Sequence, residues 1–214
     1  NTDHIWHNGK MVRGATSIGG TNVDGELRGN NSLGGGNANM TGATNSTTGG
    51  TGASLQSTAN AIIAAGESNL ITGVGDPTLW INSGIVGGQS NAITNSKNAV
   101  IGGGYQNVIT DSSSSFIGGG DGNQATVAGA AVVVGGTNNK ANGNRGQVLG
   151  GTFNEANAFA ATALGLKAQI THNYAFLINT LPGADVNTDS DPFNSASVSE
   201  FGVRCDNVRI FTNL

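Results

Sequence analysis

Four oxygen-bearing side chains alternate along a polar segment near the C-terminus. They are Asp185, Asn187, Asp189 and Asp191. Carboxylates and amides at alternate positions are the ligands that calcium takes in an EF-hand loop. That loop also needs a glycine at its sixth position and a bidentate glutamate at its twelfth, where this chain has Ser190 and Ala196. The four residues are therefore a weak metal candidate, and we expect a solvated acidic loop with no cofactor.

Hydrolysis of a glycan would need a paired acid and base. The carboxylates that could serve are scattered, and they are Glu67, Asp76, Asp111, Asp121 and Glu155. Asp121 and Glu155 stand at similar positions of a repeat, two periods apart, and could line one surface. Because the repeat forces no pair together, we expect no enzymatic activity.

Two further motifs lack the residues that their chemistry needs. Gly9-Lys10 is followed by Met11, whereas a phosphate-binding loop needs serine or threonine there and a helix that it opens. His4 and His7 are three residues apart on a predicted strand, so they point to opposite faces. We therefore expect neither a nucleotide nor a shared metal at these positions.

Two aromatic residues are candidates for surface recognition. Trp80 lies in residues 73–83, which interrupt the repeat, and Tyr105 lies at a predicted corner. Aromatic side chains at such places either stack on sugars or pack against a neighbouring subunit. The sequence leaves both alternatives open.

A recurring motif must position all of these residues: a small apolar cluster, then Gly-Gly, then an asparagine. One copy is Ile85-Val86-Gly87-Gly88-Gln89-Ser90-Asn91. The last apolar residues before glycine are spaced by 15, 16, 17, 15 and 15, and they are Val86, Ile101, Ile117, Val134, Leu149 and Leu164. Self-similarity at a short fixed period predicts stacked rungs.

The composition agrees with short strands and tight turns. Glycine supplies 36 of 214 residues, and charged residues make up only 10%, against a usual share of about 25%. A net charge of −4 without a basic stripe argues against nucleic-acid binding. No apolar run approaches the ~20 residues that cross a bilayer, so we expect no membrane insertion.

We therefore predict an all-β chain, a parallel β-solenoid of about 15-residue rungs, with glycine and asparagine at the corners. Residues 1–59 would hold an N-terminal hairpin (1–13) and degenerate rungs, 60–174 the regular solenoid, and 175–214 a C-terminal β cap. Each rung buries two or three aliphatic side chains, too few to offset the ordering of ~15 residues. This favours a homo-oligomer whose six apolar residues before glycine line a shared axis. No role is assigned to Cys205, the single cysteine.

Stretches such as Phe116–Thr126 and Ala163–Ala168 resemble the head repeats of YadA-like trimeric autotransporter adhesins. The resemblance implies a left-handed parallel β-roll, with three rolls packed around a threefold axis. Similar heads occur in phage tail fibres and spikes. The C-terminal segment Glu200–Asn213 also looks like a segment that follows such heads in phage and virus fibre proteins.

The resulting hypothesis is a structural, non-enzymatic homotrimeric fibre or spike component on the virion surface, in a phage tail or capsid fibre. Its partners would be further copies of itself, other virion proteins, and a host cell-surface glycan or protein to which the fibre attaches. One alternative is a bacterial trimeric adhesin head on the cell surface. Another is a tailspike that degrades glycans.

Overall fold

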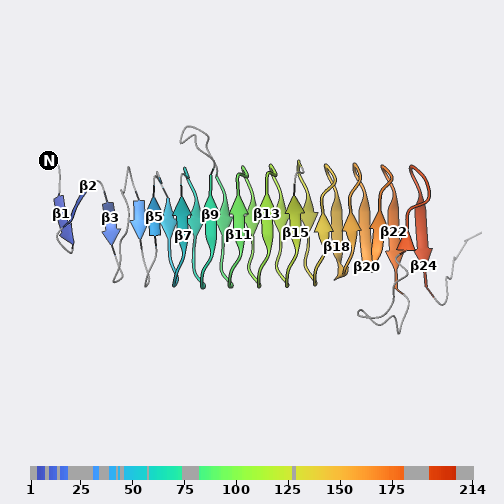
Figure 1. Ribbon diagram of the computed structural model, residues 1–214, viewed down its shortest axis with the longest axis horizontal. Coiled ribbons are helices and arrows are strands. Elements are labelled where there is room, and N and C mark those ends of the chain that lie inside the picture. The colour runs from blue at the N-terminus through green and yellow to red at the C-terminus, as the bar shows by residue number, and fades with distance from the viewer. Residues whose placement is uncertain are drawn as a thin grey trace, which may run out of the picture.

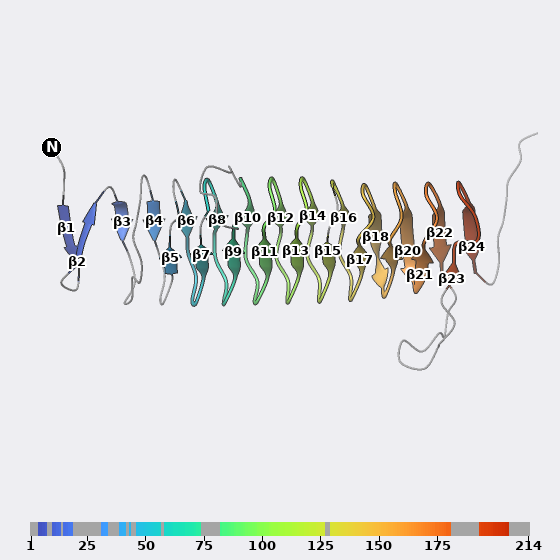
Figure 2. The same ribbon diagram turned by 45° about the horizontal axis from the view of Figure 1, so that its top comes forward.

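In the computed structural model, the protein is a stack of short β-strands (Figure 1, Figure 2). The structure describes residues 4–7, 10–13, 15–18, 31–33, 39–41, 43, 46–56, 58–73, 82–126, 129–180 and 193–205, with side chains from residue 43 onward. Every regular element in these ranges is a strand. The described residues include no helix that is long and apolar enough to span a membrane.

The larger of two parallel sheets has 12 strands and is called here the long sheet. From β4 onward every second strand of the chain belongs to this sheet, so the strands that pair within it carry even numbers. Its strands are β3 (Ala15–Ile18), β4 (Asn31–Leu33), β6 (Thr47–Thr48), β8 (Ile62–Ile63), β10 (Gly84–Ile85), β12 (Val100–Ile101), β14 (Phe116–Ile117), β16 (Val132–Val133), β18 (Gln147–Thr152), β20 (Thr162–Leu166), β22 (Phe176–Asn179) and β24 (Phe201–Arg204).

The other parallel sheet has 10 strands and is called the short sheet. From β4 to β23 each turn supplies one strand to each sheet, so the chain alternates between the two (Figure 2). Its strands are β5 (Asn39–Thr41), β7 (Ser54–Gln56), β9 (Leu70–Thr72), β11 (Ala92–Thr94), β13 (Val108–Thr110), β15 (Gln124–Thr126), β17 (Lys140–Ala141), β19 (Glu155–Ala156), β21 (Ala168–Ile170) and β23 (Phe193–Asn194).

The strand register gives the length of each turn. Ile85 pairs with Ile101, Ile101 with Ile117 and Ile117 with Val133, so these turns have 16 residues. The next two turns, through Val148 and Ala163 to the C-terminal side, shorten to 15. The fold is thus the predicted all-β parallel solenoid, with a turn close to the expected length.

The core is a single layer between the two sheets. From β7 to β22 each strand places an aliphatic, almost completely buried residue in this layer, whereas β6 places Thr48 there. The long sheet contributes Ile63, Ile85, Ile101, Ile117, Val133, Val148, Ala163 and Leu177, and the short sheet contributes Leu55, Ile71, Ile93, Ile109, Ala125, Ala141, Ala156 and Ile170. Alternation along two- and three-residue strands therefore places the neighbouring residues of each strand on the outside.

The register also corrects the length of the predicted insertion. Ile63 pairs with Ile85, which makes that turn 22 residues long, six more than the 16-residue turn that follows it. The sequence pattern suggested an excess of about eight residues, because it matched Ile63 to Val86 instead. Residues 74–81, Trp80 among them, lie outside the described ranges.

The stack crosses both predicted domain boundaries. β6 and β7 already pair with β8 and β9, and β22 and β24 continue the long sheet beyond residue 174. At the N-terminal end, β1 (His4–His7) and β2 (Lys10–Arg13) form a separate antiparallel pair within residues 1–13.

Candidate functional site

Glycines allow successive turns to approach closely at the corner that leads from the long sheet to the short sheet. Gly104 has φ +88°, and a Cβ there would lie 2.2 Å from the carbonyl oxygen of Gly120 in the next turn. The equivalent Gly88, Gly120 and Gly136 also have positive φ, as the sequence predicts for a corner. The last glycine of each motif is therefore required by the close approach of the turns.

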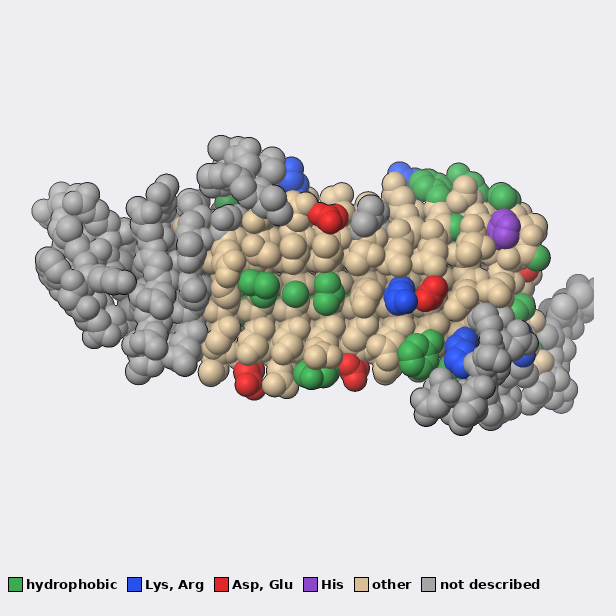
Figure 3. All heavy atoms as spheres, viewed as in Figure 1, with side chains coloured by type: hydrophobic (Ala, Val, Ile, Leu, Met, Phe, Trp, Pro, Cys, Tyr) green, Lys and Arg blue, Asp and Glu red, His purple; other side chains and the backbone are tan. Residues whose placement is uncertain are grey.

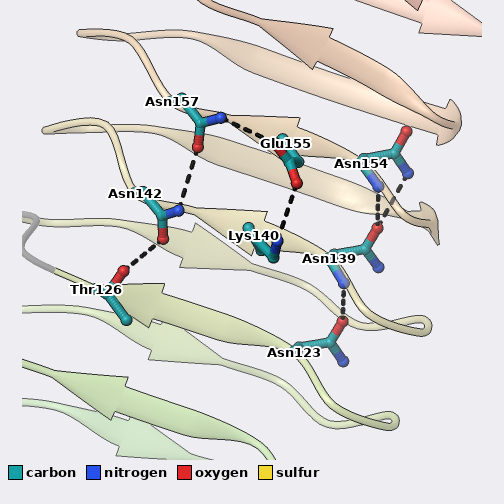
Figure 4. Close-up of polar contacts among 8 residues, drawn as sticks. All are labelled: Asn123, Thr126, Asn139, Lys140, Asn142, Asn154, Glu155 and Asn157. Carbon is teal, nitrogen blue, oxygen red and sulfur yellow. Dashed lines mark hydrogen bonds and ion pairs between the residues drawn. The ribbon is translucent and has the colours of Figure 1, made fainter. Parts of the chain in front are cut away.

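A ladder of buried asparagines runs along the same corner (Figure 4). Its members are Asn69, Asn91, Asn107, Asn123, Asn139 and Asn154, all fully buried. The Oδ1 atom of each accepts the backbone N–H of the next, as Asn123 does from Asn139 at 3.0 Å. The Asn123 amide donates at 2.9 Å to Gly119 and at 2.9 Å to Gly136, in its own and the following turn.

The ladder changes the role that the sequence suggests for asparagine. These six residues do not have positive φ; the residue before each of them does, including Ser90, Gln106 and Asn138. The asparagine side chain instead satisfies buried backbone groups between turns, which would otherwise be costly to desolvate. The ladder is therefore a structural feature of the stack, with its side chains buried inside the corner.

The six apolar residues before glycine do not form one row. Ile101 and Ile117 are fully buried in the core of a single chain, so they cannot line an axis shared between chains. Val86, Val134 and Leu149 lie on the outside with 41–59% of their surface exposed, and Leu164 is half-buried. The physical reason is the third glycine of some copies, since Gly102 and Gly118 occupy the outward position that Val86 has in its own turn.

The outside of the long sheet carries an apolar face, defined here as Ile62, Val86, Val100, Phe116, Val134 and Leu149. Ile62, Val100 and Phe116 share one column of the sheet, with Gly84 between the first two. All six are exposed large hydrophobic residues. Phe176 and Phe201 continue this face toward the C-terminal end, with ring centroids 5.5 Å apart. Contiguous exposed apolar patches are a feature of many interaction surfaces in other proteins.

The outside of the short sheet is more polar. Thr72, Thr94, Thr110 and Thr126 form one in-register column. Thr126 donates to Asn142, which donates to Asn157, which donates to Glu155 (Figure 4). On the face that Figure 3 shows, most of the described surface is neither hydrophobic nor charged, and lysine, arginine, aspartate and glutamate side chains are few.

Lys140 and Glu155 form an ion pair on this polar side at 3.0 Å (Figure 4). Both side chains are partly exposed, so water screens their attraction. We expect Glu155→Gln to change the free energy of unfolding by less than about 1 kcal/mol. Urea denaturation at low and high salt checks this, and a loss of several kcal/mol would show that the pair matters more than its exposure indicates.

The structure separates the two carboxylates that seemed able to share a surface. Asp121 lies in a corner column, where its bridge partners are Tyr105 and Thr137. Glu155 lies in β19 and pairs with Lys140 on the short sheet. Their expected equivalence is therefore wrong, because the two residues belong to different positions of the turn.

The other sequence candidates are distributed as follows. Tyr105 is exposed at the glycine corner, in the column of Gln89 and Asp121. Asp185, Asn187, Asp189 and Asp191 lie outside the described residues. Within the described ranges no group of three or more histidine, cysteine or acidic side chains could hold a metal ion. Cys205, just after β24, is half-buried.

A cluster that the repeat motif does not single out lies at the opposite corner, in three successive C-terminal turns. The aromatic corner comprises Arg145, Phe159 and Tyr174. The rings of Phe159 and Tyr174 meet edge to face at 5.4 Å, and the Arg145 guanidinium carbon lies 5.4 Å from the Phe159 ring centroid. One feature of the sequence could have indicated this cluster. Earlier turns have small residues at this corner, Ser113-Ser114 and Gly129-Ala130, and the later turns have bulky ones.

The comparisons add no relative to this picture. No protein-family model matches the chain, and no curated protein matches it in sequence.

Proposed function

We propose that this chain is a structural, non-enzymatic segment of a trimeric extracellular fibre, such as a viral tail or capsid fibre that attaches to a host surface. In this proposal the three chains are left-handed parallel β-rolls packed around a common axis. The number of chains and the viral setting rest on the sequence resemblance to YadA-like heads and to virus fibre segments. The packing surface rests on the structure.

The observation that carries the proposal is the apolar face of the long sheet. Its six side chains are exposed in a single chain, although each would gain about 1 kcal/mol or more from burial. These side chains lie on the outer face of the long sheet, away from the core of their own chain, so in this proposal another chain covers them. Three copies with their long sheets facing inward would close a ring and leave no apolar face exposed.

The proposed role follows from this geometry. With successive turns about 4.8 Å apart, the stack is a stiff spacer whose length is set by the number of turns. The short sheets and corners of three chains would face outward in register. Such a fibre presents each contact three times, which raises avidity without any new contact.

Light scattering on the purified chain tests the proposal. We expect a native mass of three times the chain mass of 21.3 kDa. Val134→Asp should convert this trimer to monomers, because it would place an unpaired charge in the seam. Thr110→Asp, on the short sheet, is the matched control and should leave the mass unchanged. A wild-type monomer, or equal effects of the two variants, would contradict the proposed packing surface.

A further inference from the structure

The aromatic corner places large side chains where the solenoid needs none. Arg145 and Tyr174 have φ of +60° and +59°, in a column that also holds Ser114, Ala130 and Ala160. Bulky residues disfavour positive φ. Tyr174 nevertheless exposes 57% of its surface. The turn would form more easily with small residues, which indicates that these side chains serve a purpose other than the turn.

The charge of the corner is also uncompensated. Arg145 is exposed, and it forms no hydrogen bond or ion pair from its guanidinium group among the described residues. Glu200, the acidic residue three turns along this corner, accepts the backbone N–H groups of Ala196 and Ser197 at 2.5 and 3.1 Å. The described corner thus offers a guanidinium held over an aromatic ring and ready to pair with an anion.

We propose that the aromatic corner binds a carboxylate-bearing glycan. The C–H face of a pyranose ring would pack on the exposed Tyr174 ring, which meets the Phe159 ring edge to face, because the electron-rich face of an aromatic ring attracts weakly positive hydrogens. The sugar carboxylate would accept a bidentate hydrogen bond from Arg145. Exposed amides of Asn144 and Asn173 flank the two rings on the same corner.

The size and charge of the corner favour a sugar over a protein partner. The site consists of two rings and one guanidinium, which matches one or two sugar units and is far smaller than the ~800 Å² per partner of a stable protein interface. The site lies within one chain. The function proposed above matters only for how many copies of the site a fibre presents. Three copies would raise avidity, but each site is complete without the other chains.

Binding to an array of uronic- and sialic-acid oligosaccharides, each beside its carboxyl-reduced counterpart, tests the inference. We expect the wild-type chain to bind carboxylate-bearing glycans and to bind the reduced forms about tenfold more weakly or not at all. Absence of binding to every acidic glycan would overturn the proposal. So would equal binding to the acidic and reduced forms.

Variants locate the binding and control for folding. Tyr174→Ala should weaken binding about tenfold, Tyr174→Phe should preserve it, and Arg145→Gln should remove the preference for the acidic form. Gln106→Ala is the matched control, an exposed residue with positive φ at the other corner, and should bind as wild type. Loss of binding in Gln106→Ala alone would overturn the assignment.

Light scattering on the same samples separates this inference from the proposed fibre. A wild-type monomer that binds acidic glycans would overturn the trimer and keep the glycan site. If Tyr174→Ala dissociates a wild-type trimer, the corner is a contact between chains and the glycan site is wrong.

Discussion

Replacing Asn123 with alanine is expected to lower the free energy of unfolding by about 3 kcal/mol or more. The side chain is fully buried, and its amide donates to Asn107 Oδ1 at 3.1 Å as well as to two glycine carbonyls. Its Oδ1 atom is also the acceptor for the Asn139 backbone N–H. Alanine removes every one of these bonds and takes away the acceptor of the buried Asn139 backbone N–H, although Asn107 Oδ1 keeps the backbone N–H of residue 123. Urea denaturation at a fixed protein concentration, followed by circular dichroism, measures the loss.

Asn157→Ala provides the matched control for the ladder. Asn157 is also an asparagine bonded to its neighbours along the stack, but it is exposed on the polar side, where water can replace its contacts with Glu155 and Asn142. Its replacement should cost less than about 1 kcal/mol. Similar losses for Asn123→Ala and Asn157→Ala would mean that burial of the ladder does not determine its contribution.

The second large effect is expected from Gly104→Ala, with a loss of about 3 kcal/mol or more. The new Cβ would lie 2.2 Å from the Gly120 carbonyl oxygen and 2.7 Å from Asn107 Nδ2, so two turns would have to separate. The φ of +88° adds backbone strain for any residue with a side chain. The shift in thermal unfolding midpoint, again at fixed concentration, reports this loss.

The preceding residue is the natural control. Gly103 does not have positive φ, and the atom nearest to a Cβ there is 3.9 Å away in Gly87. Gly103→Ala should therefore be nearly neutral. A large loss at Gly103, or none at Gly104, would place the constraint on the wrong glycine of the triplet.

The repeat predicted the parallel stack because the motif recurs once in each turn, at spacings within one residue of the turn length. It did not predict which side of the strand each apolar residue takes. Ile101 and Val86 both precede glycine, yet one is buried and the other exposed, since an extra glycine shifts the motif by one residue. A shift of one residue along a strand moves a side chain to the opposite face.

The ladder and the aromatic corner could not be identified from local patterns for a different reason. An asparagine after Gly-Gly is equally compatible with an exposed turn and with a buried amide, and only the stacked neighbour in the next turn decides between them. Similarly, Arg145, Phe159 and Tyr174 are separated by about one turn in sequence. They become neighbours only through the parallel register, whose turns shorten toward the C-terminus.

The direction of the asparagine ladder has a mechanical consequence. Its hydrogen bonds, like those of both sheets, run along the axis of the stack, so a pull applied to the two ends of one chain loads the turns in series. Each turn would then peel from its neighbour separately, beginning at whichever end is less well bonded. A force across the axis would instead be shared by many turns at once. A single chain should therefore yield gradually under tension along its length and resist bending much more strongly.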